Sequence, residues 1–370
     1  MAAWFGRRQN CRFNQQTRGI MGERTLRRDR APKRGGQAEG AHRKTVLGGA
    51  CAAAVFALVP IQLAGAQTPD HSPSARAADA TPHSLPTRVG VLTWNICGAL
   101  SRDGSPSCPG TSRGKINELV DRVNHDRSIA VVMIQEACES LHSRPLQDAL
   151  NHAGSGEWVV RHRTAKSPGT DNPVRCPRTG RKDAGVAVAM KKLPGTDLVY
   201  DKQGKPGWDM TFTSTSEPGG KHTQGAACLQ DRGNKLLACT SHFANANADP
   251  SKQMRRASAR DFRNQARSWQ NGGYRTVIGG DLNLKPGDSA IRPLYSGNFE
   301  ADSDEKCTTT GPWYLKGCRN AAGDKLDYIF FSDRGWDLVQ GRPIYVGSWS
   351  YNIGRLSDHW MLRGVVRPSA

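Results

Sequence analysis

The chain has 370 residues, and its 52 Lys and Arg against 33 Asp and Glu give a net charge of +19. Hydrophobic residues make up 37% of the sequence and glycines number 40, as expected of a globular protein with a sizeable core and many loops. This composition excludes a largely disordered chain. The basic balance favours an anionic partner, such as nucleic acid or phospholipid headgroups.

The N-terminal region has the pattern of a targeting segment. Residues 1–42 are polar and rich in arginine, and a basic patch then precedes an apolar run over 46–63. Small residues at 64–66 complete the pattern of a secretory signal peptide that is cleaved after Ala66. A membrane anchor is the alternative, but glycine, proline and alanine residues make the run only weakly apolar. We therefore predict an N-terminal extension with a signal peptide over 1–66, and a secreted protein.

Residues 67–86 are rich in Pro, Ala, Ser and Asp, which predicts a flexible linker. The folded domain is predicted to occupy 87–370. Residues 164–183 form a Pro-, Gly- and Arg-rich loop, which is either a solvated surface loop or a basic rim that grips an anionic substrate.

Many strands and few helices are predicted within the folded domain. Apolar runs bounded by turn residues predict strands at 89–95, 129–135, 158–163, 185–190, 210–215, 226–229, 235–240, 275–279, 326–331 and 361–366. Apolar residues at helical spacing predict helices at 114–125 and 140–152, and residues 251–270 are predicted to form a helix with one charged face. This order of elements favours a layered α/β sandwich, with two packed sheets flanked by helices.

Eight cysteines follow Ala66, and an even number in an exported chain predicts four disulfides. They are Cys97, Cys108, Cys138, Cys176, Cys228, Cys239, Cys307 and Cys318. The pairs Cys228/Cys239 and Cys307/Cys318 are favoured because their members are close in sequence. The first pair flanks a hairpin turn at 231–234. A four-residue loop would bring the two cysteines opposite each other, whereas a two-residue loop would offset them. Cys97 has two candidate partners, Cys108 and Cys138. A zinc site is disfavoured because no Cys-x-x-Cys occurs.

Six short polar motifs lie at the ends of predicted strands. They are Trp94-Asn95, Gln135-Glu136, Ser241-His242, Gly280-Asp281-Leu282-Asn283, Leu326-Asp327-Tyr328 and Ser357-Asp358-His359. Each motif alone is most often a turn, a cap or a surface feature. Together they supply four carboxylates and two asparagines, hard oxygen ligands suited to Mg²⁺, Mn²⁺ or Ca²⁺. With two histidines for proton transfer, this set indicates metal-assisted hydrolysis at phosphorus.

The ordered motifs resemble those of the endonuclease/exonuclease/phosphatase superfamily, which has the deoxyribonuclease-I-like fold. Its members include pancreatic-type deoxyribonuclease, abasic-site endonucleases, bacterial sphingomyelinases and inositol polyphosphate phosphatases. The resemblance covers residues 89 to about 366. It implies an α/β (α+β) fold, a four-layer α/β/β/α sandwich of two packed mixed β-sheets flanked by helices.

The resemblance also implies roles at the metal and the water. Glu136 is expected to be the main Mg²⁺ ligand, with Asn95 beside it, and Asp358 is expected to help bind metal or water. Asp281 is expected to orient or deprotonate the attacking water.

Four further residues are implied to act at or near the phosphate. Asn283 is expected to bind the scissile phosphate, and His242 to contact a phosphoryl oxygen. His359 is expected to be the catalytic histidine that faces the phosphorus. Asp327 is expected to bond the far nitrogen of His359 and so fix its tautomer.

The motifs identify the bond that is cleaved better than the substrate. Basic charge and arginines near the predicted helix at 251–270 (Arg255, Arg256, Arg260 and Arg263) favour a nuclease acting on DNA or RNA over a phospholipid-cleaving enzyme. Aromatic residues at 313–314 and 349–351 suit base stacking or insertion at a lipid interface. A sphingomyelinase- or phospholipase C-like hydrolase is the alternative, followed by a non-catalytic binding or toxin-like module. We expect a monomer.

Overall fold

The computed structural model describes residues 85–98, 108–166, 172–212, 225–302, 324–344 and 356–369. The predicted signal peptide with its cleavage site, most of the predicted linker, the Cys307/Cys318 pair and the aromatic residues at 313–314 and 349–351 lie outside these ranges. Leu85, within the predicted linker, is partly buried against the central core.

Twelve strands of the described residues form two six-stranded sheets. The first sheet has the order β11 (Trp336–Ile344), β12 (Met361–Pro368), β1 (Val89–Asn95), β2 (Ile129–Cys138), β4 (Ala184–Lys191) and β3 (Trp158–Thr164). The second has the order β5 (Trp208–Thr211), β6 (Gly225–Asp231), β7 (Leu236–His242), β8 (Arg275–Asp281), β10 (Asp327–Ser332) and β9 (Asn298–Glu300). Both sheets are mixed, because β1 pairs with β2 and β7 with β8 in parallel while the other pairs are antiparallel.

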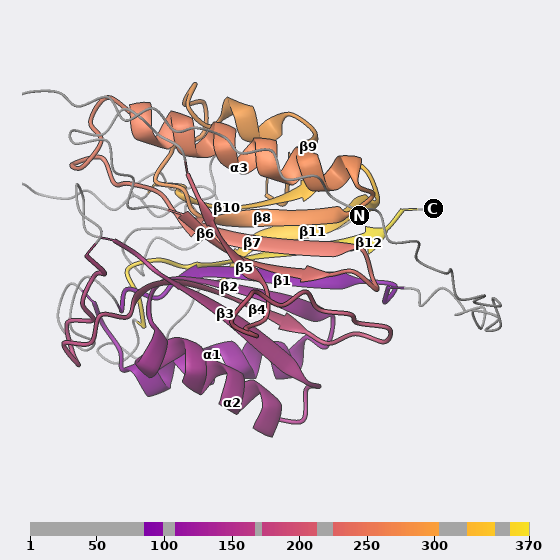
Figure 1. Ribbon diagram of the computed structural model, residues 1–370, viewed down its shortest axis with the longest axis horizontal. Coiled ribbons are helices and arrows are strands. Elements are labelled where there is room, and N and C mark those ends of the chain that lie inside the picture. The colour runs from indigo at the N-terminus through magenta and orange to yellow at the C-terminus, as the bar shows by residue number, and fades with distance from the viewer. Residues whose placement is uncertain are drawn as a thin grey trace, which may run out of the picture. The chain divides into compact units, whose positions relative to one another are not determined.

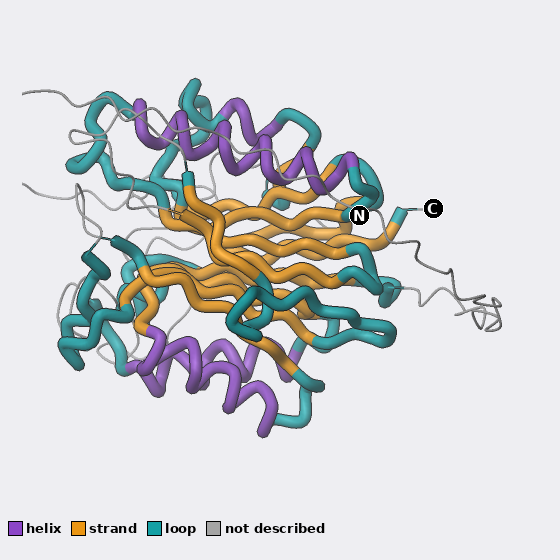
Figure 2. The backbone as a smooth tube through the Cα atoms, viewed as in Figure 1, coloured by secondary structure: helices purple, strands orange, loops and turns teal. Residues whose placement is uncertain are grey.

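The helices cover the outer faces of the two sheets. Figures 1 and 2 show α1 (Ser112–His125) and α2 (Arg144–His152) against one sheet, and α3 (Gln253–Asn271) against the other. A short 3-10 helix, η2, spans Arg292–Tyr295. This arrangement confirms the predicted four-layer α/β/β/α sandwich. None of the helices in the described ranges is both long enough and apolar enough to cross a membrane.

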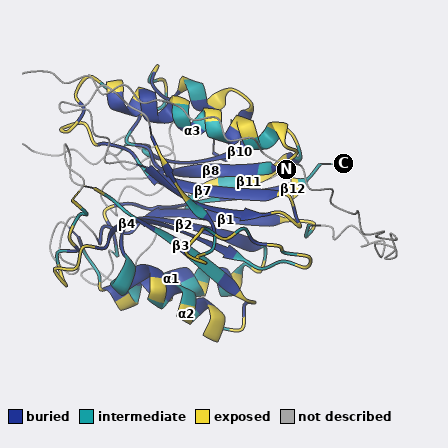
Figure 3. Ribbon diagram, in the orientation of Figure 1, coloured by how far each residue is buried: buried dark blue, intermediate teal, exposed yellow. Residues whose placement is uncertain are grey.

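Three apolar cores lie between these four layers. The central core joins residues such as Val131 and Met133 of β2 to Ala238 and Val277 of the second sheet. A second core lies beneath α3, and a third lies beneath α1 and α2. The inner strands are buried on both faces (Figure 3), which is why they appear in the sequence as continuous apolar runs.

Four local features differ from the sequence prediction. The strands β9 and β11 were not predicted: β9 has three residues, and β11 is an edge strand whose middle residues are exposed, so neither has a strong apolar signal. The predicted helix at 140–152 begins instead as a π-helical segment, η1 (Glu139–Ser143), and continues as α2. The strand β5 ends at Thr211.

Two disulfides are present among the described cysteines. Cys228–Cys239 confirms the favoured pair, since β6 and β7 are joined by a four-residue loop that places the two cysteines opposite each other. Cys138 pairs with Cys176, so the candidate Cys97/Cys138 pairing was wrong. The Cys138–Cys176 bond instead ties the end of β2 to the basic loop at 172–183.

Candidate active site

Ends of strands from both sheets bring the polar motifs together. In the first sheet, Asn95 lies opposite Gln135, the residue before Glu136. In the second sheet, Asp281 pairs with His242 on one side and with Asp327 on the other. A hydrogen bond from Asn95 Nδ2 to Asp281 Oδ2, 3.0 Å long, joins the two sheets at this point. The motifs from distant parts of the chain therefore meet at one end of the sandwich.

Asn95 links two carboxylates that belong to different sheets. Its Nδ2 atom donates to Glu136 Oε1 at 3.1 Å as well as to Asp281. Its Oδ1 atom accepts the backbone N–H of Cys97 at 2.9 Å, which assigns the orientation of the amide. Asn95 thus presents its amino group to the carboxylates, and presenting its oxygen to a cation would require the amide to rotate.

Glu136 is a mostly buried carboxylate, with its side chain 11% exposed. It sits at a positive φ of 52°, where the register between β2 and β4 shifts. Burial raises the pKa of Glu136, while the charge of His242 and the hydrogen bond from Asn95 oppose that rise. Among the described residues no lysine or arginine forms an ion pair with Glu136, whose Oε1 atom lies 4.0 Å from Nε2 of His242.

His359 lies between two buried carboxylates. Its Nδ1 atom is 2.7 Å from Asp327 Oδ2, and its Nε2 atom is 3.7 Å from Asp281 Oδ2. Burial lowers the pKa of His359, but the charges of Asp327, Asp281 and the neighbouring Asp358 outweigh burial and raise the pKa to about 10. The bond to Asp327 assigns a proton to Nδ1 and leaves Nε2 facing the site, the arrangement expected from the sequence.

His242 lies beside the same carboxylate as His359, with Nε2 3.4 Å from Asp281 Oδ2. Asn283 has a positive φ of 49°, and its backbone N–H donates to Asp281 Oδ1 at 2.9 Å. The Nδ2 atom of Asn283 donates to the carbonyl of Phe243 at 3.1 Å. Asp281 is thus contacted on one oxygen by the loop that follows it and on the other by side chains from three other motifs.

Asp358 is the one exposed member of the predicted set. Its charge raises the pKa of both Glu136 and His359, which places it within electrostatic reach of both. Ser357, which precedes it, donates through Oγ to the carbonyl of Asn95 at 2.6 Å and accepts the N–H of His359 at 3.1 Å. The structure therefore brings together all eight residues predicted from the sequence.

Three residues within the motifs have positioning contacts that the sequence alone did not reveal. Ser357 joins the loop of His359 to the end of β1, as described above. Trp94 Nε1 donates to the carbonyl of His359 at 3.1 Å. Gln135 Nε2 donates to Thr93 and, across the sheets, to Thr240 Oγ1 at 2.8 Å. In the sequence, the only sign that these three residues matter was that they lie within the motifs. Their positioning roles are visible only in the tertiary contacts.

A buried lysine lies next to two cysteines near this end of β1. Lys115 Nζ is 3.4 Å from the carbonyl of Cys97 and 3.4 Å from Cys108 Sγ. A hydrogen bond between the two thiol groups contributes to the raised pKa of Cys97. The structure therefore places Cys97 and Cys108 side by side, the alternative pair that the sequence left open.

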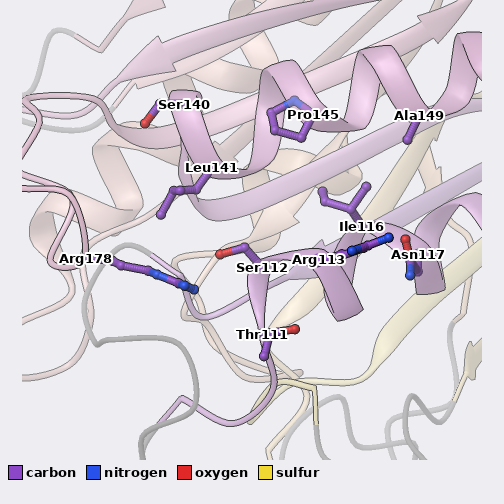
Figure 4. Close-up of a pocket in the computed structure, with 10 residues that line it drawn as sticks. All are labelled: Thr111, Ser112, Arg113, Ile116, Asn117, Ser140, Leu141, Pro145, Ala149 and Arg178. Atoms are coloured by element: carbon purple, nitrogen blue, oxygen red, sulfur yellow. The ribbon is translucent and has the colours of Figure 1, made fainter.

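A pocket lies between the start of α1 and the η1–α2 segment (Figure 4). Ile116, Leu141 and Pro145 give it an apolar lining, and Arg113 and Arg178 flank it with positive charge. Both arginines are exposed, and neither forms an ion pair with any residue that the structure describes. Arg178 belongs to the basic loop that the Cys138–Cys176 disulfide anchors, two residues after Cys176.

Comparisons with known proteins identify the family and the fold. Residues 92–359 match the Endonuclease/Exonuclease/phosphatase family. The human Nocturnin catalytic domain with bound sulfate anion superposes with a TM-score of 0.54 at 15% identity, over 76% of this chain and 94% of that one. An endonuclease/exonuclease/phosphatase family protein from Bacteroides thetaiotaomicron gives a TM-score of 0.54 at 13% identity, over 77% and 97% of the two chains. A similar protein from Bacteroides vulgatus gives 0.51 at 14% identity, over 77% and 100%.

At these identities the structural likeness concerns the fold. No curated protein matches the sequence. The family match, by contrast, covers the six motifs from Asn95 to His359. The chain therefore belongs to the endonuclease/exonuclease/phosphatase family, whose members are hydrolases that act on phosphoester bonds and generally use divalent metal ions.

Proposed function

We propose that this chain is a secreted, metal-dependent phosphodiesterase, and that its substrate is DNA or RNA. The observation that carries the proposal is the buried group formed by Asp327, His359 and Asp281. It holds a histidine with one nitrogen bonded to a carboxylate and the other directed at a second carboxylate. Such a group can hold or move a proton beside a phosphoryl oxygen.

The donor set suits a divalent cation. Glu136, Asp281 and Asp358 bring three carboxylates to one place, and no lysine or arginine of the described residues is paired with Glu136. Glu136 and Asp358, with Asn95 after rotation of its amide, would hold Mg²⁺, or else Mn²⁺ or Ca²⁺, which when bound withdraws charge from the phosphoryl oxygens. Carboxylate oxygens are the ligands that these cations prefer.

The remaining residues would act on the water and the phosphate. Asp281 would orient or deprotonate the attacking water, because its oxygens already accept hydrogen bonds from Asn95 and from the backbone of Asn283. His242 and His359 would contact phosphoryl oxygens, and Asn283 would bind the scissile phosphate. In-line attack of the water then breaks a P–O bond through positioning and charge stabilisation, without a covalent enzyme intermediate.

The charge of the molecule supports nucleic acid as the substrate. Residues 67–370, which remain after the proposed cleavage, hold 40 Lys and Arg against 30 Asp and Glu, a net charge of +10. Arg113 and Arg178 flank the pocket near the end of β2. The helix α3, in contrast, covers the outer face of the second sheet (Figure 1). Its Arg255 is buried. The basic loop is therefore a better candidate for phosphate contacts than α3. A sphingomyelinase- or phospholipase C-like activity is the alternative.

A substrate panel tests the proposal. Purified protein from Gln67 onward would be incubated with plasmid DNA, RNA, sphingomyelin and inositol phosphates, each with Mg²⁺ or Ca²⁺. We expect cleavage of nucleic acid that is abolished by EDTA and reduced at least about 10²-fold in His359→Ala. Full activity of His359→Ala would refute the mechanism, and cleavage of sphingomyelin alone would favour the alternative substrate. To test secretion, the full-length chain would be expressed in cells and sought in the culture medium. We expect to find it there with Gln67 at its N-terminus.

A further inference from the structure

Arg255 is a buried arginine that the proposed chemistry does not use. It lies in the first turn of α3, and its side chain is only 4% exposed. The next residue, Arg256, is exposed, and its Nη2 atom donates to Ser289 Oγ at 2.8 Å. A guanidinium is costly to bury unless its donors are satisfied, so the partners of Arg255 indicate what it holds in place.

One set of contacts joins Arg255 to the loop that follows His242. The backbone N–H of Arg255 donates to Asp249 Oδ2 at 2.9 Å, and Nε donates to the same oxygen at 3.3 Å. Its Nη2 atom also donates to the carbonyl of Asp249. Burial raises the pKa of Asp249, but the hydrogen bonds and charge of Arg255 outweigh burial and lower it. Asp249 is therefore an ionised partner that fixes the guanidinium and the 243–252 loop together.

The other contact joins Arg255 to the loop that follows Asp281. Its Nη1 atom donates to the carbonyl of Asn283. That carbonyl belongs to a residue at a φ of 49°, a sparsely populated backbone region that needs support from its surroundings. The N–H of Asn283 is held by Asp281, and its side chain is held by the carbonyl of Phe243. Arg255 completes this support on the carbonyl side.

We infer that Arg255 is a positioning residue that sets the orientation of Asn283 for the scissile phosphate. One guanidinium bonds both the loop of His242 and the loop of Asn283, and its planar fork holds acceptors in two fixed directions. The inference rests on the proposed function for the role of Asn283. It goes beyond that function because Arg255 acts through the backbone and touches no substrate.

A lysine in place of Arg255 keeps the charge but loses the fork. A lysine ammonium is a compact point charge, so it can bond Asp249 without holding the carbonyl of Asn283 in the same plane. We therefore expect Arg255→Lys to fold and to lose part of the activity. Arg255→Met removes both contacts, and Arg256→Met is the matched control, since it removes the same charge one residue further along α3.

Steady-state kinetics on bis(p-nitrophenyl) phosphate with Mg²⁺ give the first readout. This small diester needs no contact with the basic loop. We expect Arg255→Met to lower kcat about 10²-fold with little change in KM, because misplacement of a group by about 1 Å has an effect of that size. We expect Arg256→Met to match the wild type. In an Asn283→Ala background, Arg255→Met should have little further effect, because the two residues act as one unit.

Amide hydrogen exchange gives a readout that does not depend on turnover. The peptide covering 282–288 should exchange faster in Arg255→Lys than in the wild type, while peptides from β8 should not change. If the wild type cleaves no diester, the proposed function fails, and exchange alone still tests whether Arg255 holds this loop. Unchanged exchange in Arg255→Lys, or a kcat loss that adds to that of Asn283→Ala, would overturn the inference. If Arg255→Met does not fold, the lysine variant supplies both readouts.

Discussion

The Nδ1 atom of His359 lies 2.7 Å from Oδ2 of Asp327, and both residues are buried although 32 positions separate them in the sequence. The pair joins β10 of the second sheet to the loop that enters β12 of the first. It orients the imidazole so that Nε2 faces Asp281, which accepts a hydrogen bond from Asn95. The orientation of the proposed catalytic histidine thus depends on contacts between the two sheets.

Replacing Asp327 should therefore disturb the histidine without removing it. In Asp327→Asn, the amide can bond Nδ1 as a donor and so favour the wrong tautomer of His359. We expect kcat to fall roughly 10- to 100-fold, the usual effect of losing a residue that orients a functional histidine. Steady-state kinetics on plasmid DNA measures this, with circular dichroism to verify folding. An unchanged kcat would show that the tautomer of His359 is unimportant.

Glu136 should control the affinity for the cation. Its carboxylate is buried and lacks a lysine or arginine partner among the described residues, so a bound cation would supply the missing charge. We expect Glu136→Gln to weaken Mg²⁺ binding at least about 10-fold, as measured by isothermal titration calorimetry. Glu139→Gln is the control, because that carboxylate bonds the exposed Arg144. Equal affinities in the two variants would remove Glu136 from the cation site.

The arginines beside the pocket should govern the salt dependence of nucleic acid binding. The logarithm of the binding constant falls as the logarithm of the salt concentration rises, and each phosphate contact that is lost makes this dependence shallower by about 1. We expect Arg113→Ala and Arg178→Ala each to make the salt dependence shallower and to weaken binding equally for all nucleic acid sequences. Fluorescence anisotropy with a labelled duplex from low to moderate salt checks this, and Arg256→Ala serves as the control. A slope equal to that of the wild type would exclude this pocket from the interface.

The cysteines beside Lys115 should form a disulfide under oxidising conditions. Exchange with oxidised glutathione would join Cys97 Sγ to Cys108 Sγ and release two molecules of reduced glutathione, with both thiol protons transferred. We expect the oxidised protein to lose labelling of both cysteines by iodoacetamide, and peptide mapping to recover a Cys97–Cys108 peptide. Cys108→Ser should leave Cys97 open to labelling after denaturation. Mapping that joins Cys97 to any other cysteine would refute the pairing.

Acid should remove a stabilising contact at Asp126. This carboxylate accepts hydrogen bonds from Ser128 and Arg363, and although burial raises its pKa, these bonds lower it below the ordinary value of 3.8. Because the pKa is lower in the folded state, the stabilisation is present above about pH 4 and is lost as the pH falls through the folded pKa. We expect Asp126→Asn to lower the free energy of unfolding by about 1 kcal/mol at pH 7. Urea unfolding at a series of pH values should show that this difference shrinks as the pH falls below about 4.

The sequence predicted most of the buried architecture, because strands covered on both faces must be apolar throughout. The runs ending in Asn95 and in Gln135-Glu136 are of this kind, and they were located to within a few residues. The edge strand β11 escaped prediction because solvent covers its middle residues, so no apolar pattern marks it. The pairing of Cys228 with Cys239 was predictable because a short hairpin determines it locally.

The partners of Cys138 and Arg255 were decided only by the tertiary structure. Both depend on contacts between loops that are far apart in the sequence, and no local sequence pattern predicts such contacts. The same holds for Asn95, whose residue type suggested a cation ligand but whose amide bridges two carboxylates. The amino-acid sequence by itself determined which chemical groups are available, because the residue types of the six motifs and their order along the chain can be read directly from it. Their hydrogen-bond partners, and hence their protonation and orientation, were decided by the packing of two sheets against each other.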